Sequence, residues 1–216
     1  MTEKPTIAIL GGTGHEGTGL ALRWASNGYK VIIGSRMEEK ALQVTGELNE
    51  LLGEELIRGM ENGAAAREAD INVLTVVASA HEAALNGLKD DLKGKILVDA
   101  TARIQFPNPK PPGPPSAARM AQELLGEDVR VVAAFQNIPA STLKDLEKEL
   151  DSDVLVCADN REDADQVGEL IRGAGMKAYY VGNLDIAITL EGLTAVLVYL
   201  NKYNNLKHAS IKIVGS

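Results

Sequence analysis

The chain has 216 residues, of which 45% are hydrophobic, 24% charged and only 4% aromatic, and its formal net charge is −8. These proportions are ordinary for a globular protein, and the length suits one medium domain with a smaller addition. The acidic balance argues against a general nucleic-acid binder, because phosphate contacts need clustered Lys and Arg. The scarcity of aromatic residues indicates an aliphatic core, as in a sheet covered by helices.

The single cysteine, Cys157, lies in an apolar run and is expected to be buried. Without a second cysteine no disulfide forms within the chain, which suits a reducing cytoplasm. The N-terminus lacks a signal-peptide pattern, and no apolar run approaches the roughly 18 residues of a membrane span. The histidines, at positions 15, 81 and 208, are too scattered to predict a metal site. We therefore expect a cytoplasmic protein with no membrane, nucleic-acid or metal partner.

Short β-branched runs alternate with amphipathic stretches along the chain. Strands are predicted at residues 6–10, 30–34, 56–60, 71–77, 95–98, 129–133, 153–157 and 178–181. Helices are predicted at residues 17–25, 37–52, from about 79, 161–172 and 184–203. Several strand runs do not alternate apolar with polar residues, which is typical of strands buried on both faces. The pattern predicts an α/β fold of the Rossmann type, a doubly wound parallel sheet at residues 1–150 with a small C-terminal α/β part at 151–216.

The C-terminal part carries its own boundary signals. Asn160 is placed to cap the helix at 161–172, and Gly175 to follow its end. The helix at 184–203 has more apolar residues than one buried face requires. We expect this helix to pack on both sides, with one side at a subunit interface.

A glycine-rich turn follows the first strand. Gly12, Gly14 and Gly17 have the spacing G-x-G-x-x-G, after a predicted strand and at the start of a predicted helix. The first glycine permits a tight turn, the second lets a pyrophosphate approach the backbone, and the third lets helix and strand pack closely. The helix N-terminus adds free N–H groups and a partial positive charge. This context favours dinucleotide binding over a plain turn, with His15 and Glu16 exposed or lining the entrance.

The end of the second strand indicates which dinucleotide binds. An NAD site usually has Asp or Glu there, about 20 residues beyond the loop, to bond the ribose 2′-hydroxyl. This chain has Ser35 and Arg36 instead, with Lys40 one turn along if the helix starts at Arg36. Ser35 and Glu38 also form a capping box, and a solvated helix face is the alternative role for the two cations. We predict a 2′-phosphate site and therefore NADP(H).

Two further features have open interpretations. The stretch 106–115 is rich in proline and cannot be a regular helix or an inner strand. It is either a surface connection or a stiff loop bordering the ligand crevice, and we favour the second. Arg103 either meets an anionic substrate or lies on the surface. After Glu191 the chain has no acid but keeps Lys202, Lys207 and Lys212, which favours an anionic partner unless they are simply solvated.

Taken together, six segments resemble the NADPH-dependent coenzyme F420 reductases, also called F420H2:NADP oxidoreductases. The segments read ILGGTGHEGTGLA, VIIGSRMEEKA, ADINVLTV, VRVVAAFQNIPA, SDVLVCADN and LEGLTAVLVYLN. The similarity runs over nearly the whole chain in order. It implies a homodimer that transfers a hydride between NADP(H) and C5 of the deazaflavin of coenzyme F420, with residues 151–216 completing the deazaflavin cleft. Two places depart from the family pattern: Val77-Ala78, where a Pro is frequent soon after the fourth strand, and Ile188, where Arg is expected.

The glycine loop and the resemblance together indicate which residues bind the two cofactors. They are Gly12, Thr13, Gly14, His15, Glu16, Gly17, Ser35, Arg36, Lys40, Val76, Val77, Ala78, Ser79, Ala134, Phe135, Gln136, Ile138 and Pro139. Hydride transfer needs alignment more than acid–base groups. Asn137 and His81 are the catalytic candidates, as donors to charge that develops on the reduced ring, with structural roles as the alternative. Two other functions stay open: an NADPH-dependent reductase of a flavin or small carbonyl compound, and a sensor that binds NADP(H) without turnover.

Overall fold

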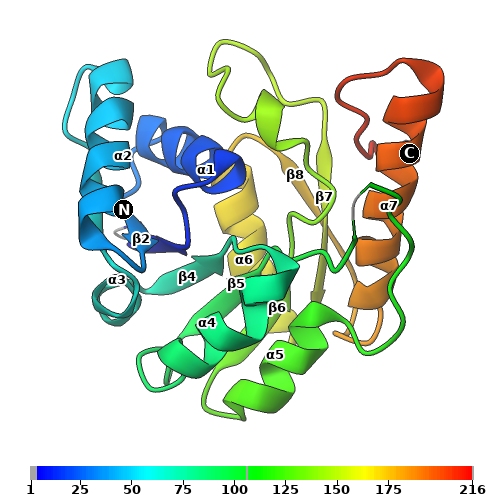
Figure 1. The fold of residues 1–216 in the computed structure, drawn as a ribbon, viewed down its shortest axis with the longest axis horizontal. Coiled ribbons are helices and arrows are strands. Elements are labelled where there is room, and N and C mark those ends of the chain that lie inside the picture. The colour runs from blue at the N-terminus through cyan, green and yellow to red at the C-terminus, as the bar shows by residue number, and fades with distance from the viewer. Residues whose placement is uncertain (1–3, 106, 216) are drawn as a thin grey trace.

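The computed structural model describes residues 4–105 and 107–215, with a mostly parallel sheet between two layers of helices (Figure 1). In this part of the chain the sheet has eight strands: β1 (Ile7–Leu10), β2 (Val31–Ser35), β3 (Ile57–Glu61), β4 (Ile71–Leu74), β5 (Ile96–Asp99), β6 (Arg130–Ala133), β7 (Asp153–Ala158) and β8 (Lys177–Gly182). The helices are α1 (His15–Ser26), α2 (Glu38–Leu52), α3 (Asn62–Glu68), α4 (His81–Leu88), α5 (Ala117–Leu125), α6 (Arg161–Gly173) and α7 (Ala187–Asn204), with 3-10 turns η1 (Ala78–Ala80) and η2 (Ala140–Thr142). None of these described helices is long and apolar enough to cross a membrane.

The strand order is β3-β2-β1-β4-β5-β6-β7-β8. The first six of these strands run parallel, whereas β7 pairs antiparallel with β6 and parallel with β8. The order of the first six is the doubly wound arrangement of dinucleotide-binding folds. The predicted Rossmann-type sheet is therefore confirmed. The C-terminal part extends this sheet, and its treatment as a separate unit beyond residue 150 stays a prediction.

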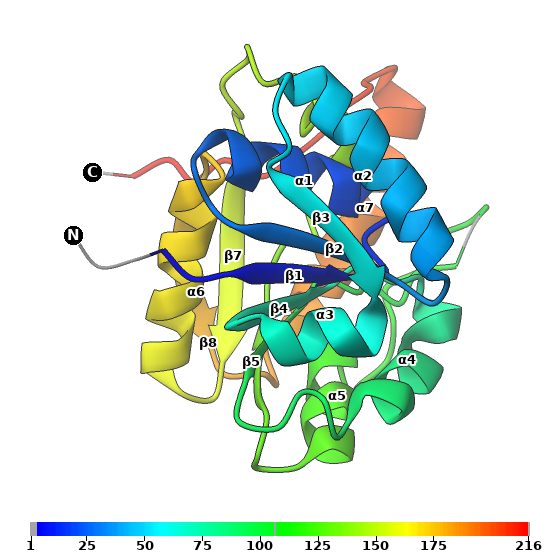
Figure 2. The same cartoon turned by 90° about the vertical axis from the view of Figure 1, so that its left-hand side faces the viewer.

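Alternate side chains of the inner strands enter two separate cores. Ile7 and Ile9 of β1 face the core that includes residues of α1, α2 and α6, whereas Ala8 and Leu10 face the core that includes residues of α3, α4, α5 and α7. All four are fully buried, as strands covered on both faces require. Figure 2 shows α1 and α2 on one side of the sheet and α3, α4 and α5 on the other.

Most predicted elements are confirmed to within a few residues, but α3 and α5 were not predicted. Each begins at a side-chain cap: Glu61 accepts from the N–H groups of Gly63 and Ala64, and Ser116 Oγ accepts from Arg119 N. Two boundaries also differ. The strand predicted at 71–77 ends at Leu74, and the helix expected from residue 79 starts as the turn η1 before continuing as α4. The chain therefore leaves the sheet after Leu74, and residues 75–81 lie at the carboxyl edge of the sheet.

The structure confirms the predicted boundaries of the helix at 161–172, which is α6. Asn160 Oδ1 accepts from Glu162 N at 2.8 Å, which confirms the predicted cap of α6. Gly175 has φ +87° just beyond that helix, and Cys157 is fully buried. Burial raises the pKa of the Cys157 thiol to about 12, so the thiol is unreactive. In contrast, among the described residues α7 is covered on one side: Leu190 is buried, whereas its apolar residues Val196, Leu200 and Tyr203 are exposed.

Candidate active site

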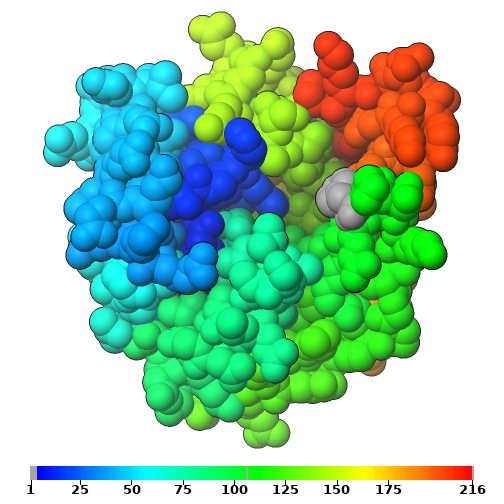
Figure 3. Space-filling view, viewed as in Figure 1, coloured from blue at the N-terminus to red at the C-terminus, as the bar shows by residue number. Residues whose placement is uncertain are grey.

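The carboxyl ends of β1, β4, β5 and β6 lie in register at one edge of the sheet. Leu10 pairs with Leu74, Leu74 with Asp99, and Asp99 with Ala133. The segments that follow these strands are therefore neighbours along this edge: residues 11–17, 75–81, 100–103 and 134–139. Figure 3 shows the face of the molecule hollowed between the blue, teal and yellow-green parts of the chain that hold three of these segments. We call this hollow the crevice, and doubly wound folds bind ligands at this place, where the strand order reverses.

The three glycines of the loop occupy three different environments. A β-carbon added to Gly12 would lie 2.6 Å from the carbonyl oxygen of Ile9, and one added to Gly17 would lie 2.5 Å from Gly12 Cα. Neither position has room for a side chain. A β-carbon on Gly14 would meet no described atom within 4 Å, at the N-terminus of α1 where free N–H groups point outward. This open cradle fits a pyrophosphate, as the glycine spacing predicts.

Asn62, which the sequence did not single out, holds the glycine loop in place. Its Oδ1 accepts a hydrogen bond from Gly11 N at 3.0 Å. The same oxygen would lie 2.7 Å from a β-carbon on Gly34, so the loop, β2 and the start of α3 meet at this atom. Gly12 N adds a bond to the carbonyl oxygen of Gly34 at 3.1 Å. The loop is therefore fixed before any ligand arrives.

The variable positions of the loop behave differently from one another. Thr13 is half-buried and His15 is exposed, as expected for residues at an entrance. Glu16 departs from that expectation, because its Oε1 is out of reach of water and has no hydrogen-bond partner among the described residues. Burial raises the pKa of this carboxyl group from 4.5 to about 8. The first turn of α1 therefore carries a carboxyl group that is neutral at pH 7.

The predicted 2′-phosphate site lies at the end of β2. Ser35 is buried, and Arg36 and Lys40 are exposed beside it. The predicted capping box is wrong, because α2 begins at Glu38 with Met37 as its N-cap and none of the described side chains caps it. Ser35 Oγ instead accepts from Met37 N at 3.2 Å, so Arg36 lies in a turn before the helix. Lys40 lies in the first turn of α2, and its Nζ donates to Gln43 Oε1 at 3.4 Å. That Ser35, Arg36 and Lys40 meet one phosphate stays a prediction.

The segment after β4 presents backbone and small side chains to the crevice. Val77 is 70% exposed and Val76 is half-buried, and Ala78 and Ser79 lie on η1. His81, in contrast, is buried, with its Nε2 2.6 Å from Asp99 Oδ2. The imidazole is held against the end of β5. A catalytic role for His81 stays a prediction, and this geometry favours a positioning role.

The segment after β6 turns sharply at Phe135. This residue has φ +75°, in the left-handed region that bulky residues rarely adopt. Its ring is 2% exposed and packs edge-to-face on Trp24 with the ring centroids 6.0 Å apart. Ala134 is fully buried, and Ile138 and Pro139 follow the turn. Phe135, predicted to bind cofactor, can therefore do so only through its backbone, and such strained residues often occur at active sites.

Asn137 joins this segment to α7. Its Nδ2 donates to the carbonyl oxygen of Leu190 at 2.8 Å and to Thr194 Oγ1 at 3.0 Å. The Thr194 hydroxyl in turn donates to the carbonyl oxygen of Gln136 at 2.8 Å. Both amide hydrogens of Asn137 are thus used inside the protein. Its predicted role as a donor to the reduced ring stays a prediction, and these bonds favour holding the segment in position.

Arg103 is neither a free surface arginine nor an open anion site. Its backbone N–H and its Nε both donate to Glu191 Oε2, at 2.8 and 3.2 Å. Its terminal nitrogen donates to the carbonyl oxygens of Gly113 and Pro115. The guanidinium therefore clamps the proline-rich stretch onto α7. Phe106, at the start of that stretch, lies outside the described residues.

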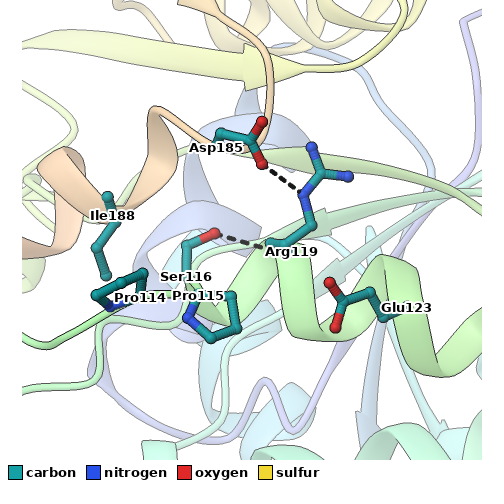
Figure 4. A pocket seen from close by; sticks show the side chains of 7 residues that line it. All are labelled: Pro114, Pro115, Ser116, Arg119, Glu123, Asp185 and Ile188. Atoms are coloured by element: carbon teal, nitrogen blue, oxygen red, sulfur yellow. Dashed lines mark hydrogen bonds and ion pairs between the residues drawn. The ribbon is translucent and has the colours of Figure 1, made fainter.

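A pocket of about 540 Å³ lies between α5 and the start of α7 (Figure 4). Its lining residues are Pro114, Pro115, Ser116, Arg119, Glu123, Asp185 and Ile188. Arg119 forms ion pairs with Asp159 and Asp185, at 2.7 and 2.9 Å. Ile188, where the family resemblance leads one to expect Arg, lies beside Pro114 in Figure 4. This pocket shares no lining residue with the glycine loop or with segment 134–139, so the departure at Ile188 lies outside those parts of the crevice.

Part of the basic C-terminal tail contacts other side chains of the protein. Lys212 Nζ lies 2.7 Å from Asp151 Oδ1, and Lys202 lies over the ring of Tyr203 at 5.6 Å. His208 Nδ1 lies 2.9 Å from Ser141 Oγ. Lys202 and Lys207 are exposed, so the anionic partner that these charges favour stays a prediction. Across residues 4–105 and 107–215 no three His, Cys, Asp or Glu side chains gather as a metal site would require.

Comparison with known proteins points to one enzyme family. A protein-family model described as NADP oxidoreductase coenzyme F420-dependent matches residues 6–103. The chain is 38% identical to the F420-dependent NADP reductase of Methanothermobacter marburgensis and 39% identical to that of Methanocaldococcus jannaschii, over 97% of this chain and 98% of each relative.

Solved structures share the fold. The crystal structure of a proposed F420-dependent NADP reductase from Arthrobacter sp. FB24 has a TM-score of 0.83 at 24% identity, over 98% of this chain and 100% of that one. Plasmodium falciparum pyrroline carboxylate reductase with NADP bound has a TM-score of 0.62 at 18% identity, over 94% of this chain and 68% of that one. At these identities the likeness shows the fold alone.

Proposed function

The chain belongs to the family of F420-dependent NADP reductases, and we propose how its crevice serves the hydride transfer between NADP(H) and coenzyme F420. The reaction passes a hydride between nicotinamide C4 and C5 of the deazaflavin. The observation that carries the proposal is the shared edge of the sheet, where the open cradle at Gly14 and the segment 134–139 follow strands in register. At one end of the crevice the open space at Gly14 fits a pyrophosphate, and at the other end lies the fixed backbone turn at Phe135.

The strand spacing sets where the two rings lie. Neighbouring strands are about 4.8 Å apart, so β5 and β6 lie roughly 10 and 14 Å from β1. NADP(H) is held at β1 by the glycine loop and at β2 by Ser35, Arg36 and Lys40. The nicotinamide then extends past segment 76–79 towards β5, and the deazaflavin lies on segment 134–139 beyond it. We assign residues 1–150 to NADP(H) and residues 151–216 to closing the deazaflavin side.

The protein's contribution to the reaction is alignment and exclusion of water. Segment 134–139 is rigid because Phe135 is anchored in the core and Asn137 is bonded to α7. Backbone N–H groups beside the strained turn are the donors best placed to stabilise charge on the reduced ring. In this proposal Asn137 and His81 act by holding the two walls of the crevice, which keeps both rings at reacting distance.

A homodimer would cover the exposed side of α7. Val196, Leu200 and Tyr203 of this helix are 49%, 41% and 71% exposed, and Leu206 beyond it is 51% exposed. Apolar residues grouped in this way mark interaction surfaces. We propose that two copies pair through α7 in a reducing cytoplasm, and a Leu200→Asp variant should sediment as a monomer if this face is the interface.

Absorbance of the deazaflavin tests the activity directly. The protein is mixed with NADPH and oxidised coenzyme F420, and free flavin replaces F420 in the control. We expect F420 absorbance to fall with F420 and little turnover with flavin. Turnover with flavin but none with F420 would contradict the proposed acceptor.

A further inference from the structure

Asp99, at the end of β5, is the centre of a buried polar cluster. Its side chain is fully buried, and Oδ1 accepts from Thr101 N at 2.9 Å. Its Oδ2 lies 2.6 Å from His81 Nε2, and its carbonyl oxygen accepts from Gln136 Nε2 at 2.7 Å. Asp99 therefore ties together the segments that follow β4, β5 and β6, which are neighbours at the carboxyl edge of the sheet.

Two polar side-chain atoms of residues bonded to Asp99 have no hydrogen-bond partner in the described part of the chain. Thr101 is 3% exposed and Gln136 is 8% exposed, yet Thr101 Oγ1 and Gln136 Oε1 have no hydrogen-bond partner among the described residues. Buried polar atoms in folded proteins are nearly always paired, so these two unpaired atoms, on the segments that follow β5 and β6, call for an explanation. A flip of the Gln136 side-chain amide would break its hydrogen bond to the Asp99 carbonyl oxygen. Gln136 Oε1 is therefore fixed as a free acceptor, while the Thr101 hydroxyl can donate.

We propose that Thr101 Oγ1 and Gln136 Oε1 together recognise an amide-type group, an N–H beside a C=O, on a ring bound in the crevice. The Gln136 oxygen accepts from the N–H, and the Thr101 hydroxyl donates to the C=O. The proposal rests on the proposed function, because it takes the ring from one of the two cofactors. Two sources carry this chemistry: the carboxamide of the nicotinamide, and the dione edge of the deazaflavin.

Asp99 and His81 are positioning residues in this scheme. Asp99 fixes the orientation of the Gln136 amide. The backbone carbonyl oxygen of Asp99 accepts from Gln136 Nε2, which leaves Gln136 Oε1 without a partner among the described residues. Asp99 also fixes the start of the Thr101 turn through Oδ1. A site with a fixed acceptor and a donor discriminates against a ring that lacks either partner, since a buried polar group would then stay unpaired.

Thr101→Val tests the proposal, because it removes the hydroxyl and keeps the shape. Gln136→Leu is the second variant, and Thr45→Val is the control, since Thr45 is equally buried on α2 and bonded within its own helix. Binding is measured for three ligands: 2′,5′-ADP, which has no nicotinamide, NADPH, and oxidised F420. We expect Thr101→Val to melt at the same or a higher temperature and to weaken one ring-bearing ligand by about tenfold or more. The affinity for 2′,5′-ADP should stay within about twofold.

Which ligand is weakened identifies the source of the amide-type group. A loss for NADPH alone assigns the nicotinamide carboxamide, and a loss for F420 alone assigns the deazaflavin edge. Unchanged binding of both, or an equal loss for all three ligands, overturns the proposal. A failure of this proposal can be told apart from a failure of the proposed function. If the unaltered protein does not bind F420, the proposed acceptor is wrong, but the NADPH titrations still test the roles of Thr101 and Gln136.

Discussion

Glu191 on α7 holds Arg103 in a clamp that joins the loop after β5 to the C-terminal helix. Oε2 of Glu191 accepts from Arg103 N at 2.8 Å and from Arg103 Nε at 3.2 Å. Oε1 accepts from Ala117 N at 2.6 Å, so the same carboxyl group also anchors the start of α5. Burial raises the pKa of Glu191, while the N–H groups of Ala117 and Arg103 act in the opposite direction. One side chain on α7 therefore holds both the loop after β5 and the start of α5.

Replacing Glu191 by Ala should destabilise the protein. The change leaves two backbone N–H groups, those of Arg103 and Ala117, and the Arg103 Nε without their acceptor, which costs roughly 3 kcal/mol in the free energy of unfolding. Glu123→Ala is the matched control, because Glu123 is an exposed acid on α5 close by. Urea unfolding measures both variants. Similar stabilities for the two would show that the clamp contributes little.

The glycine loop gives a sharper pair of variants. Gly14 has φ −82° and open space where a methyl group would go, so Gly14→Ala should cost about 1 kcal/mol or less in stability but obstruct the pyrophosphate. Gly17→Ala would place its methyl group 2.5 Å from the backbone of Gly12, so it should destabilise the fold by about 2 to 3 kcal/mol. Thermal melting and NADPH titration separate the two effects. A Gly14→Ala protein that binds NADPH normally would place the pyrophosphate elsewhere.

Selection of NADPH over NADH should depend on Arg36. Loss of a charge-assisted bond to phosphate costs about 1.5 to 3 kcal/mol, or roughly 10- to 100-fold in affinity. Arg36→Ala should therefore weaken NADPH by that factor and leave NADH nearly unchanged. Arg161→Ala, an exposed arginine at the start of α6, is the control. Equal losses for NADPH and NADH in the Arg36 variant would remove the 2′-phosphate assignment.

The elements that could be predicted are those whose signal is local. The strand β1, the glycines and the start of α1 follow from an apolar run and a fixed spacing. The helix α3 has only seven residues, too few for a clear apolar stripe, and α5 directly follows the proline-rich stretch. Both begin at capping residues, Glu61 and Ser116, which were the available signals.

The parts of the site that could not be predicted depend on contacts between distant segments. Asn62 reaches Gly11 only because β3 and β1 flank β2, and Asp99 meets His81 only because β4 and β5 pair in register. Neither the order of β3, β2 and β1 nor the register of β4 and β5 can be read from a single sequence. The direction of a side chain is equally hidden, since the positive φ of Phe135 decides that its ring enters the core.

The buried carboxyl group of Glu16 should make stability depend on pH. An acid whose pKa rises from 4.5 to about 8 on folding binds more protons in the folded state, so the free energy of unfolding falls as pH increases through that window. The full shift corresponds to roughly 5 kcal/mol, which is the upper end of the expected loss because part of the residue is exposed. Glu16→Gln keeps the neutral shape and should remove this slope.

Urea unfolding at pH 4 and pH 8.5 measures the effect. Glu16→Gln should be more stable than the unaltered protein by up to roughly 5 kcal/mol at the higher pH and nearly equal to it at the lower pH. Glu82→Gln, an exposed acid in the first turn of α4, should show no such difference. Ionised Glu16 also lies in the helix turn assigned to the pyrophosphate, so NADPH affinity should fall above pH 8 in the unaltered protein and not in Glu16→Gln. Parallel pH profiles for the two proteins would mean that the carboxyl group reaches water and titrates as an ordinary acid.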